Sequence, residues 1–338
     1  MNTSRYVQGE WQAWPSVKLS GGLRHSKVAF NSRDNYIVTG NGDDSGAIAY
    51  RATTPAAGVV WSLTERVNLY GTVGRGFETP TFNELAYKPV GTGLNFALKP
   101  ATSRHSEAGV KVQFEGATLN LALFRADTVD EIVTLTNAGG RAIFQNAGRT
   151  QRRGIELGVM KHFASTGITL TGAYTWIEAK YRDSFLTCLV VPCAAPNVTV
   201  AAGNALPGVP RKSLYVEALW RMPRGAGSGA VGGAASGTPA APAGFFGQPY
   251  AAIELRRIAQ MMADDRNSDA AEGYTVVNLR AGLEQRSGNW RLSEFIRLDN
   301  AGNTRYAGSV IVNETNGRFF EPGARRNWTL GISAALGF

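Results

Sequence analysis

The sequence contains few charged residues and no apolar run long enough to cross a bilayer as a helix. Charged residues make up 18 % of the chain, against about 25 % in an average soluble domain. This shortage argues against a coiled coil or a helix-rich enzyme. The absence of about 18 consecutive apolar residues excludes membrane-spanning helices. The chain is nevertheless 43 % hydrophobic, which provides enough apolar surface to offset the entropy of ordering, so a folded protein is expected.

Side chains that bind metals or carry out catalysis are also scarce. The three histidines, His25, His105 and His162, fall on separate predicted strands without partners at metal-ligand spacing. There is no serine-nucleophile turn of the G-x-S-x-G type and no complete phosphate-binding loop. The sequence therefore predicts no enzyme and no metal site.

The only two cysteines, Cys188 and Cys193, lie close together in a predicted long loop. A disulfide is the favoured interpretation, and it is consistent with oxidation in the periplasm. A metal-binding pair is the alternative, although two ligands without a nearby histidine do not complete a site.

The formal charge of +9, from 35 basic and 26 acidic residues, raises the question of nucleic-acid binding. The arginines are scattered singly along the chain instead of forming a stripe or a basic tail. A protein that follows a phosphate backbone is expected to cluster them. Nucleic acid is therefore not an expected partner.

In contrast to these shortages, glycine is abundant, with 40 residues, and apolar residues alternate with small or polar ones over long segments. In the last predicted strand the apolar positions are Trp328, Leu330, Ile332, Ala334, Leu336 and Phe338. The same period of two runs through residues 168–176, 213–222 and 275–286. This alternation is typical of β-strands with one apolar face, so the expected fold is all-β.

Thirteen strands are predicted, and most of them contain ten or more residues. They span 4–14, 17–30, 47–61, 67–76, 103–114, 117–135, 142–163, 168–181, 211–222, 250–263, 272–286, 288–311 and 326–338. Short connections alternate with long ones such as 31–46, 77–102, 182–210 and 312–325. Tight turns at one end and long loops at the other are typical of a transmembrane antiparallel up-and-down β-barrel.

A soluble β-sandwich would show the same alternation, but two features favour the membrane barrel. Soluble strands usually contain about five or six residues, whereas tilted membrane strands need about nine to eleven. Aromatic residues also lie near strand ends on the apolar face, where a membrane barrel has its interfacial belts. These residues are Trp176, Trp220, Trp290, Trp328 and Phe338.

The predicted barrel is incomplete. Its strand count is odd, whereas bacterial single-chain barrels close with an even number. The first ten residues also lack the basic and apolar segments of a secretory signal. We therefore interpret residues 1–338 as the C-terminal portion of a larger barrel. Within it, residues 223–249 are predicted to be a Gly/Ala/Pro-rich flexible insertion on the side of the short turns.

Five segments, in order along the chain, resemble motifs of TonB-dependent outer-membrane receptors. They are 54–59 (TPAAGV), 68–85 (NLYGTVGRGFETPTFNEL), 145–157 (QNAGRTQRRGIEL), 203–211 (GNALPGVPR) and 298–308 together with 322–326 (PGARR). Arg325 stands where that family usually has proline. Each match alone is weak, whereas five ordered matches over most of the chain are specific.

This resemblance implies an energised transporter that takes a scarce ligand into the periplasm, most often a ferric siderophore and in other members haem, cobalamin or an organic cofactor. Such barrels have about 22 strands and a plugged lumen. The plug domain is absent from this sequence. The implied partners are outer-membrane lipid, the missing plug and barrel strands, the TonB complex through the missing N-terminal region, and a small-molecule ligand. No covalently bound cofactor is expected, and the transported ligand is expected to be a ferric chelate.

Two other functional classes remain as alternatives. One is a passive porin-like barrel or a barrel that anchors an adhesin or a secretion system. The other is a soluble β-sandwich that acts as a binding module.

Ligand contacts are expected from polar-face residues near the extracellular rim. Strand parity selects His105, Tyr181, Arg211, Tyr215, Arg256 and Arg280. Arginine and tyrosine there suit an anionic, aromatic chelate, through charge-assisted hydrogen bonds and stacking. The alternative is that these cations pair with lumen carboxylates or with the plug.

Overall fold

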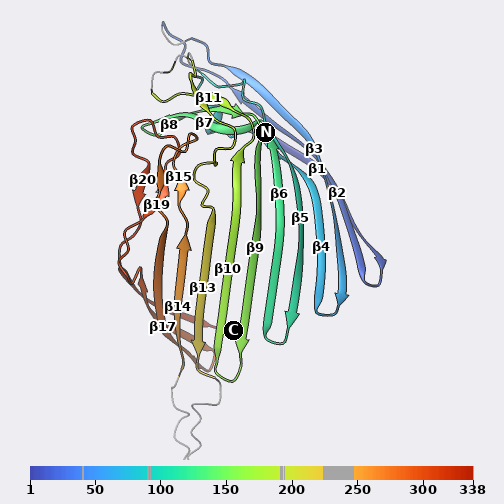
Figure 1. The fold of residues 1–338 in the computed structure, drawn as a ribbon, viewed down its shortest axis with the longest axis vertical. Helices are drawn as coiled ribbons and strands as arrows, with labels where there is room; N and C mark the ends of the chain where they lie inside the picture. Colours follow the sequence, from blue (N-terminus) through green and yellow to red (C-terminus); the bar gives the residue numbers. More distant parts are fainter. Residues whose placement is uncertain are drawn as a thin grey trace, which may run out of the picture.

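A single antiparallel sheet of thirteen strands forms the body of the protein (Figure 1). The computed structural model describes residues 1–39, 42–89, 91, 93–190, 193, 195–223 and 247–337. Residues 224–246 of the predicted insertion and the terminal Phe338 lie outside the described residues. Among the described residues, no helix has the length and apolar character needed to span a membrane.

The thirteen strands pair in sequence order, as an up-and-down meander requires. They are β1 (Asn2–Trp14), β2 (Val17–Ser32), β3 (Gly46–Thr64), β4 (Val67–Glu78), β5 (Ala101–Phe114), β6 (Ala117–Val129), β9 (Thr150–Phe163), β10 (Ile168–Tyr181), β13 (Lys212–Arg221), β14 (Gln248–Ile258), β17 (Tyr274–Ser287), β18 (Trp290–Asp299) and β21 (Asn327–Leu336). Every neighbouring pair is antiparallel. The prediction of a thirteen-stranded antiparallel meander is confirmed.

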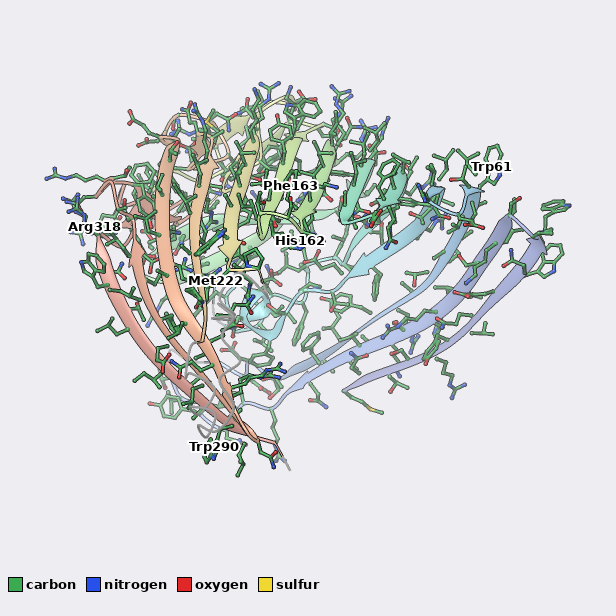
Figure 2. All side chains as sticks on the ribbon, turned by 90° about the horizontal axis from the view of Figure 1, so that it is seen from below. Trp61, His162, Phe163, Met222, Trp290 and Arg318 are labelled. Atoms are coloured by element: carbon green, nitrogen blue, oxygen red, sulfur yellow. A yellow bond between two sulfur atoms is a disulfide. The ribbon has the colours of Figure 1, made fainter. Side chains whose placement is uncertain are left out.

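The sheet is open within the described part of the chain, because β1 and β21 each pair with a single neighbour. Figure 2, seen from the end with the tight turns, shows the strands forming a curved wall. The long connections gather at the opposite end (Figure 1) and contain short elements of their own. These are α1 (Phe82–Leu85), β7 (Glu131–Ala138), β8 (Arg141–Ala147), β11 (Phe185–Thr187), β12 (Val198–Val200), β15 (Met261–Met262), β16 (Ala270–Ala271), β19 (Ala307–Val310) and β20 (Phe320–Pro322).

Four predicted strands extend too far into these loops. The segment 117–135 ends its pairing in the sheet at Val129, and 142–163 joins the sheet only from Thr150. Between them, β7 and β8 form a separate hairpin. Asp130 adopts a left-handed conformation with φ of 55°, which ends the pleated conformation at that point.

The same correction applies near the C-terminal end of the sheet. The predicted strand 288–311 leaves the sheet after Asp299, and 250–263 leaves it after Ile258. Asn300 has a φ of 48°, a conformation that asparagine tolerates better than most residues. Period-two alternation continues past each of these points, so the alternation alone does not locate the ends of the strands.

One face of the sheet is covered by the loops, and we call it the concave face. Phe30 and Ile48 pack against a cluster formed by Leu85, Leu94 and Leu98 of the β4–β5 connection. Tyr50, two residues beyond Ile48 on β3, donates a hydrogen bond from Oη to the carbonyl of Leu98 at 2.8 Å. A second cluster, near the top of β10, is made by Ala147, Ala179, Tyr181, Val200 and Leu206.

The opposite face, which we call the convex face, is apolar and exposed. Directly paired residues in a sheet share a face, so the cross-strand register follows this face around the wall. One such row of paired residues consists of Leu170, Ala218, Ile253, Leu279 and Leu298. Leu170, Ile253 and Leu279 are each exposed by 41 to 50 %. An exposed apolar band of this kind is the surface that a membrane barrel presents to lipid.

The motif around residues 79–85 is local structure at the start of the β4–β5 connection. Thr81 caps the single turn of α1 and accepts a hydrogen bond from the Glu84 amide at 3.3 Å, while Glu84 accepts one from the Thr81 amide at 2.6 Å. This reciprocal capping box satisfies the free amides at the start of the turn. It directs the chain over the concave face, where Leu85 is fully buried.

Candidate functional site on the concave face

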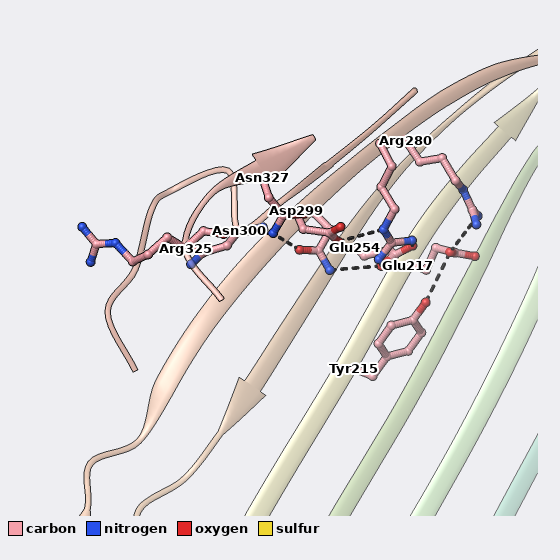
Figure 3. A network of polar contacts seen from close by, with 10 residues as sticks. Tyr215, Glu217, Glu254, Arg280, Asp299, Asn300, Arg325 and Asn327 are labelled. Carbon is pink, nitrogen blue, oxygen red and sulfur yellow. Dashed lines mark hydrogen bonds and ion pairs between the residues drawn. The ribbon is translucent and has the colours of Figure 1, made fainter. Parts of the chain in front are cut away.

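A polar network crosses the concave face of β13, β14, β17 and β18 (Figure 3). Tyr215 donates from Oη to Glu217 at 3.2 Å, and Arg280 donates from Nη2 to the same carboxylate at 3.3 Å. Glu217 lies directly opposite Glu254 in the register. Two facing carboxylates repel each other unless cations compensate them, and the arginines of this network supply that compensation.

Arg297 compensates the second carboxylate. It donates through Nη1 and Nη2 to both oxygens of Glu254, at 3.1 and 2.9 Å, and through Nε to Asp299 at 2.7 Å. Asn278 adds a hydrogen bond to Glu254 at 3.2 Å. The Glu254 side chain is only 10 % exposed, so a bidentate guanidinium is the partner that offsets its desolvation most effectively.

The network continues toward the tight-turn end through an aromatic ring. Tyr250 lies between two guanidinium groups, Arg221 at 5.4 Å and Arg280 at 5.9 Å from its ring centroid. Arg221 also pairs with Glu284 at 2.8 Å. Cation–π contacts of this kind stabilise arginine where it is partly removed from water.

A second polar cluster joins the loops above the concave face. Tyr181 donates from Oη to Asp265 Oδ1 at 2.6 Å, and Asn313 donates from Nδ2 to Asp265 Oδ2 at 2.8 Å. Asn204 donates to the backbone carbonyl of Asp265 at 2.9 Å. Three separate connections, after β10, β14 and β18, therefore meet at Asp265. Burial raises the pKa of Asp265 above its ordinary value, and the two donated hydrogen bonds oppose that rise.

The structure brings some of the predicted ligand residues together and separates others. The side chains of Tyr215, Arg256 and Arg280 lie on neighbouring strands, with Tyr215 directly opposite Arg256. Arg211 immediately precedes β13, and its carbonyl accepts a hydrogen bond from the Ile177 amide at 3.0 Å. Register and parity place these four residues on the concave face.

The other two predicted residues are in different surroundings. His105 is on β5, four strands away from β13, where its Nε2 is 2.6 Å from Ser103 Oγ. Tyr181 is 1 % exposed, with its hydroxyl donated to Asp265. The tyrosine therefore joins the loops to one another instead of lying on an open surface.

Sequence reasoning missed the carboxylates that organise the site. Glu217 and Glu254 have the same parity as Tyr215 and Arg256, and that parity was the available signal. An anionic ligand favours cationic and aromatic side chains, so the expectation of such a ligand does not point to these carboxylates. The pairing of lumen arginines with lumen carboxylates, stated above as the alternative, describes Arg280 and Arg297.

The structure joins Cys188 and Cys193 in a disulfide in the connection after β10, with a Cα–Cα distance of 6.1 Å. Within the described ranges, no group of three or more His, Cys, Asp or Glu side chains is arranged to hold a metal ion.

A comparison with known protein families agrees with the antiparallel barrel wall described above. The family model described as "TonB dependent receptor-like, beta-barrel" matches residues 2–303. The chain belongs to this family of TonB-dependent receptors. These receptors are outer-membrane β-barrel proteins, which places the chain in the outer membrane with its convex face toward lipid. The family consists of receptors and transporters and is not a family of enzymes.

Solved structures show the same fold. The ferric yersiniabactin uptake receptor FyuA from Yersinia pestis aligns with all of this chain and 45 % of its own length, with a TM-score of 0.66 and 19 % identity. The siderophore receptor PiuA from Acinetobacter baumannii aligns over 98 % of this chain and 42 % of its own, with a TM-score of 0.73 and 16 % identity.

A relative found by sequence comparison aligns with a smaller share of this chain. The vitamin B12 transporter BtuB of Vibrio vulnificus (strain YJ016) is 30 % identical over 109 residues, which are 30 % of this chain and 17 % of BtuB. The chain therefore spans less than half the length of the TonB-dependent receptors it matches.

Proposed function

We propose that this chain supplies the C-terminal part of the barrel of a TonB-energised uptake receptor, and that the receptor's ligand is a ferric siderophore or a similar iron complex. The observation that carries the proposal is the family match over residues 2–303. The names of several structural relatives favour iron: FyuA, BauA and Fiu are described as receptors for ferric yersiniabactin, ferric preacinetobactin and ferric catecholates.

The exposed side chains of the concave face favour a ligand with acidic and aromatic groups. Arg211 and Arg256 are exposed, and no carboxylate in the described part of the chain lies within ion-pair distance of either. Tyr215 on β13 is directly opposite Arg256 on β14, and Arg211 immediately precedes β13. Guanidinium groups bind carboxylates and other oxyanions through paired hydrogen bonds, and a tyrosine ring can stack on an aromatic chelator.

Transport requires additional strands. Within the described ranges, no further strand pairs with the outer edges of β1 and β21, and each unpaired backbone group costs several kcal/mol in the hydrocarbon region. We therefore propose that further strands close the barrel and that the 338 residues alone do not transport.

The test is uptake of iron-55, supplied as ferric siderophores, by cells that lack their own receptors. The cells produce either the 338 residues alone or the same residues together with a plug and closing strands. Uptake is expected only with the closed barrel, and it should be lost when TonB is deleted. Uptake by the 338 residues alone, or uptake that does not need TonB, would contradict the proposal. The second result would favour a passive pore. Transport of cobalamin or copper without iron would overturn the ligand assignment.

Replacing the exposed concave side chains tests where the ligand binds. Arg211→Ala with Tyr215→Ala in the complete receptor should weaken ferric-chelate binding about tenfold, because a charge-assisted contact and a stacking surface are lost. Arg318→Ala, an exposed loop arginine, is the control and should leave the affinity unchanged. Equal affinities for the double variant and the wild type would show that these residues do not contact the ligand.

A further inference from the structure

The convex face changes from apolar to basic at one level near the loop end. On β6, Leu123 is followed on the same face by Arg125, and on β9 Ile155 is preceded by Arg153. The register pairs Leu123 with Ile155 and Arg125 with Arg153. The apolar band therefore ends along a line that crosses both strands, and a pair of arginines lies immediately above it.

A second pair of arginines lies on the strands beside them. Arg75 on β4 is directly opposite Arg104 on β5, and Arg104 is in turn opposite Asp127 on β6. Both arginines are exposed. In the described ranges, neither has a carboxylate within ion-pair distance.

Two directly opposed like-charge pairs on one face are unfavourable within a sheet. Asp127 is paired with Arg125 at 2.7 Å, and Glu178 pairs with Arg153 at 2.6 Å. Each of these carboxylates compensates one arginine of the Arg125–Arg153 pair. Arg75 and Arg104 remain uncompensated, so an anion from outside the chain would relieve their repulsion.

Three of these four arginines, Arg75, Arg104 and Arg125, line one groove. The pairing of β3 with β4 stops at Ala56 and Gly74, above which β3 continues beside β2 and β4 continues beside β5. The groove lies at this divergence and extends to the start of β9, with a volume of about 640 Å³. Its charged lining consists of Arg75, Arg104, Arg125, Arg149, Arg182 and Asp127.

Two of these arginines are fixed at the loop end of the groove. Arg149 donates to Asp183 through its side chain, at 2.7 Å from Nη2, and through its backbone amide at 2.8 Å. The Arg182 amide donates to the Arg149 carbonyl at 2.7 Å. The hydrogen bonds from Arg149, together with the charges of Arg149 and Arg182, lower the pKa of Asp183 to about 2. The groove thus has five arginines against one aspartate in its lining.

We propose that this groove binds the phosphate groups of a phosphorylated glycolipid in the outer leaflet of the outer membrane. Its position selects a lipid over a soluble anion, because the arginines lie directly above the apolar band where headgroups meet water. Guanidinium groups bind phosphate oxygens in pairs. The acyl chains of the same lipid would cover Val73, Leu123 and Ile155 below, which are exposed by 58, 54 and 37 %.

The test uses the closed receptor extracted from outer membranes, and the probe is diphosphorylated lipid A in dodecylmaltoside micelles. The test variant is Arg75→Gln with Arg104→Gln. The matched control is Arg318→Gln with Arg325→Gln, which removes two exposed loop arginines and the same charge. Heat-modifiable mobility on gels confirms that both variants are folded. Dephosphorylated lipid A and inorganic phosphate serve as the comparison ligands.

Wild-type receptor and control should bind diphosphorylated lipid A alike, and the test variant should bind it about tenfold more weakly, with a reduced dependence on salt. Binding of the dephosphorylated lipid should be weak in all three proteins. Equal binding of both lipids, or equal weakening in test and control variants, would overturn the proposal. If millimolar inorganic phosphate competes as well as the lipid does, the groove is a site for soluble anions. This result would also overturn the proposal. None of these outcomes depends on which ligand the receptor transports.

Discussion

Two pairs of neighbouring arginines on opposite faces of the sheet differ in their partners. On the concave face, Arg280 and Arg297 are each paired with a glutamate of this chain, and their side chains are 31 and 28 % exposed. On the convex face above the apolar band, Arg75 and Arg104 face each other without a carboxylate of the described chain in ion-pair range. A partly desolvated cation needs an internal partner, whereas a cation at the membrane surface can use a partner supplied by the membrane.

The largest expected effect comes from breaking a concave pair. Glu254→Ala leaves Arg297 with only Asp299. It should lower the free energy of unfolding by about 3 kcal/mol, because a partly buried guanidinium loses its bidentate carboxylate. Glu10→Ala is the control, because Glu10 pairs with Lys18 at the open edge with side chains 67 and 48 % exposed. Its loss should destabilise the protein far less than Glu254→Ala does, because an exposed ion pair contributes little. Urea unfolding of both variants in lipid, monitored by tryptophan fluorescence, measures the two losses in unfolding free energy. Equal losses would show that the partly buried and the exposed ion pair contribute alike.

A smaller effect is expected from a glycine that an aromatic ring covers. Gly154 on β9 lies directly opposite Phe124 on β6, and a Cβ at Gly154 would meet both that ring and the Trp176 carbonyl. Gly154→Val should therefore destabilise the sheet by about 1–2 kcal/mol through overpacking. Gly158 lies on the same strand and face with no atom within 4 Å of such a Cβ. Gly158→Val should be close to neutral in the same assay, and a Gly154→Val variant as stable as Gly158→Val would show that the concave face is not packed there.

The smallest expected effect concerns the loop end of the convex groove. The pKa of Asp183 is lowered from 3.8 to about 2, so the stabilisation from its contact with Arg149 is present above pH 4 and is lost as the pH falls through about 2. Pepsin is active over this range, and cleavage of the β10–β11 region should increase as the pH is lowered. The Asp183→Asn variant should be cleaved at every pH tested as fast as the wild type is at low pH, so its rate should depend little on pH. A variant that follows the wild-type profile would assign the transition to another group.

Much of the fold could be predicted from the sequence because a membrane barrel repeats one local rule. Residues such as Leu170 and Thr171 alternate faces along a strand, and the tight turns lie where the alternation stops. The ends of strands at the loop side were harder to predict. They depend on single residues such as Asp130 and Asn300, whose left-handed conformations interrupt a pattern that otherwise continues.

The candidate site was only partly predictable. Parity placed Tyr215, Arg256 and Arg280 on the correct face, but it carries no information on which side chains pair across strands. The contacts of Glu217 with Arg280 and of Glu254 with Arg297 depend on the register between strands far apart in sequence. The role of Asp265 depends on three loops that meet in space, and a period of two has no bearing on that contact.

The convex face is assigned to lipid and the concave face to the water-filled lumen, and a pair of spin labels tests this assignment most directly. Leu170 and Thr171 are neighbours on β10 and lie on the convex and concave faces, respectively. Two variants of the closed receptor, Leu170→Cys and Thr171→Cys, each carry a nitroxide on the introduced cysteine. The native cysteines are joined in a disulfide and are not labelled. The label at residue 170 should collide mainly with oxygen dissolved in lipid, and the label at 171 mainly with a water-soluble nickel chelate. Equal accessibility at the two positions, or the reverse pattern, would contradict the account.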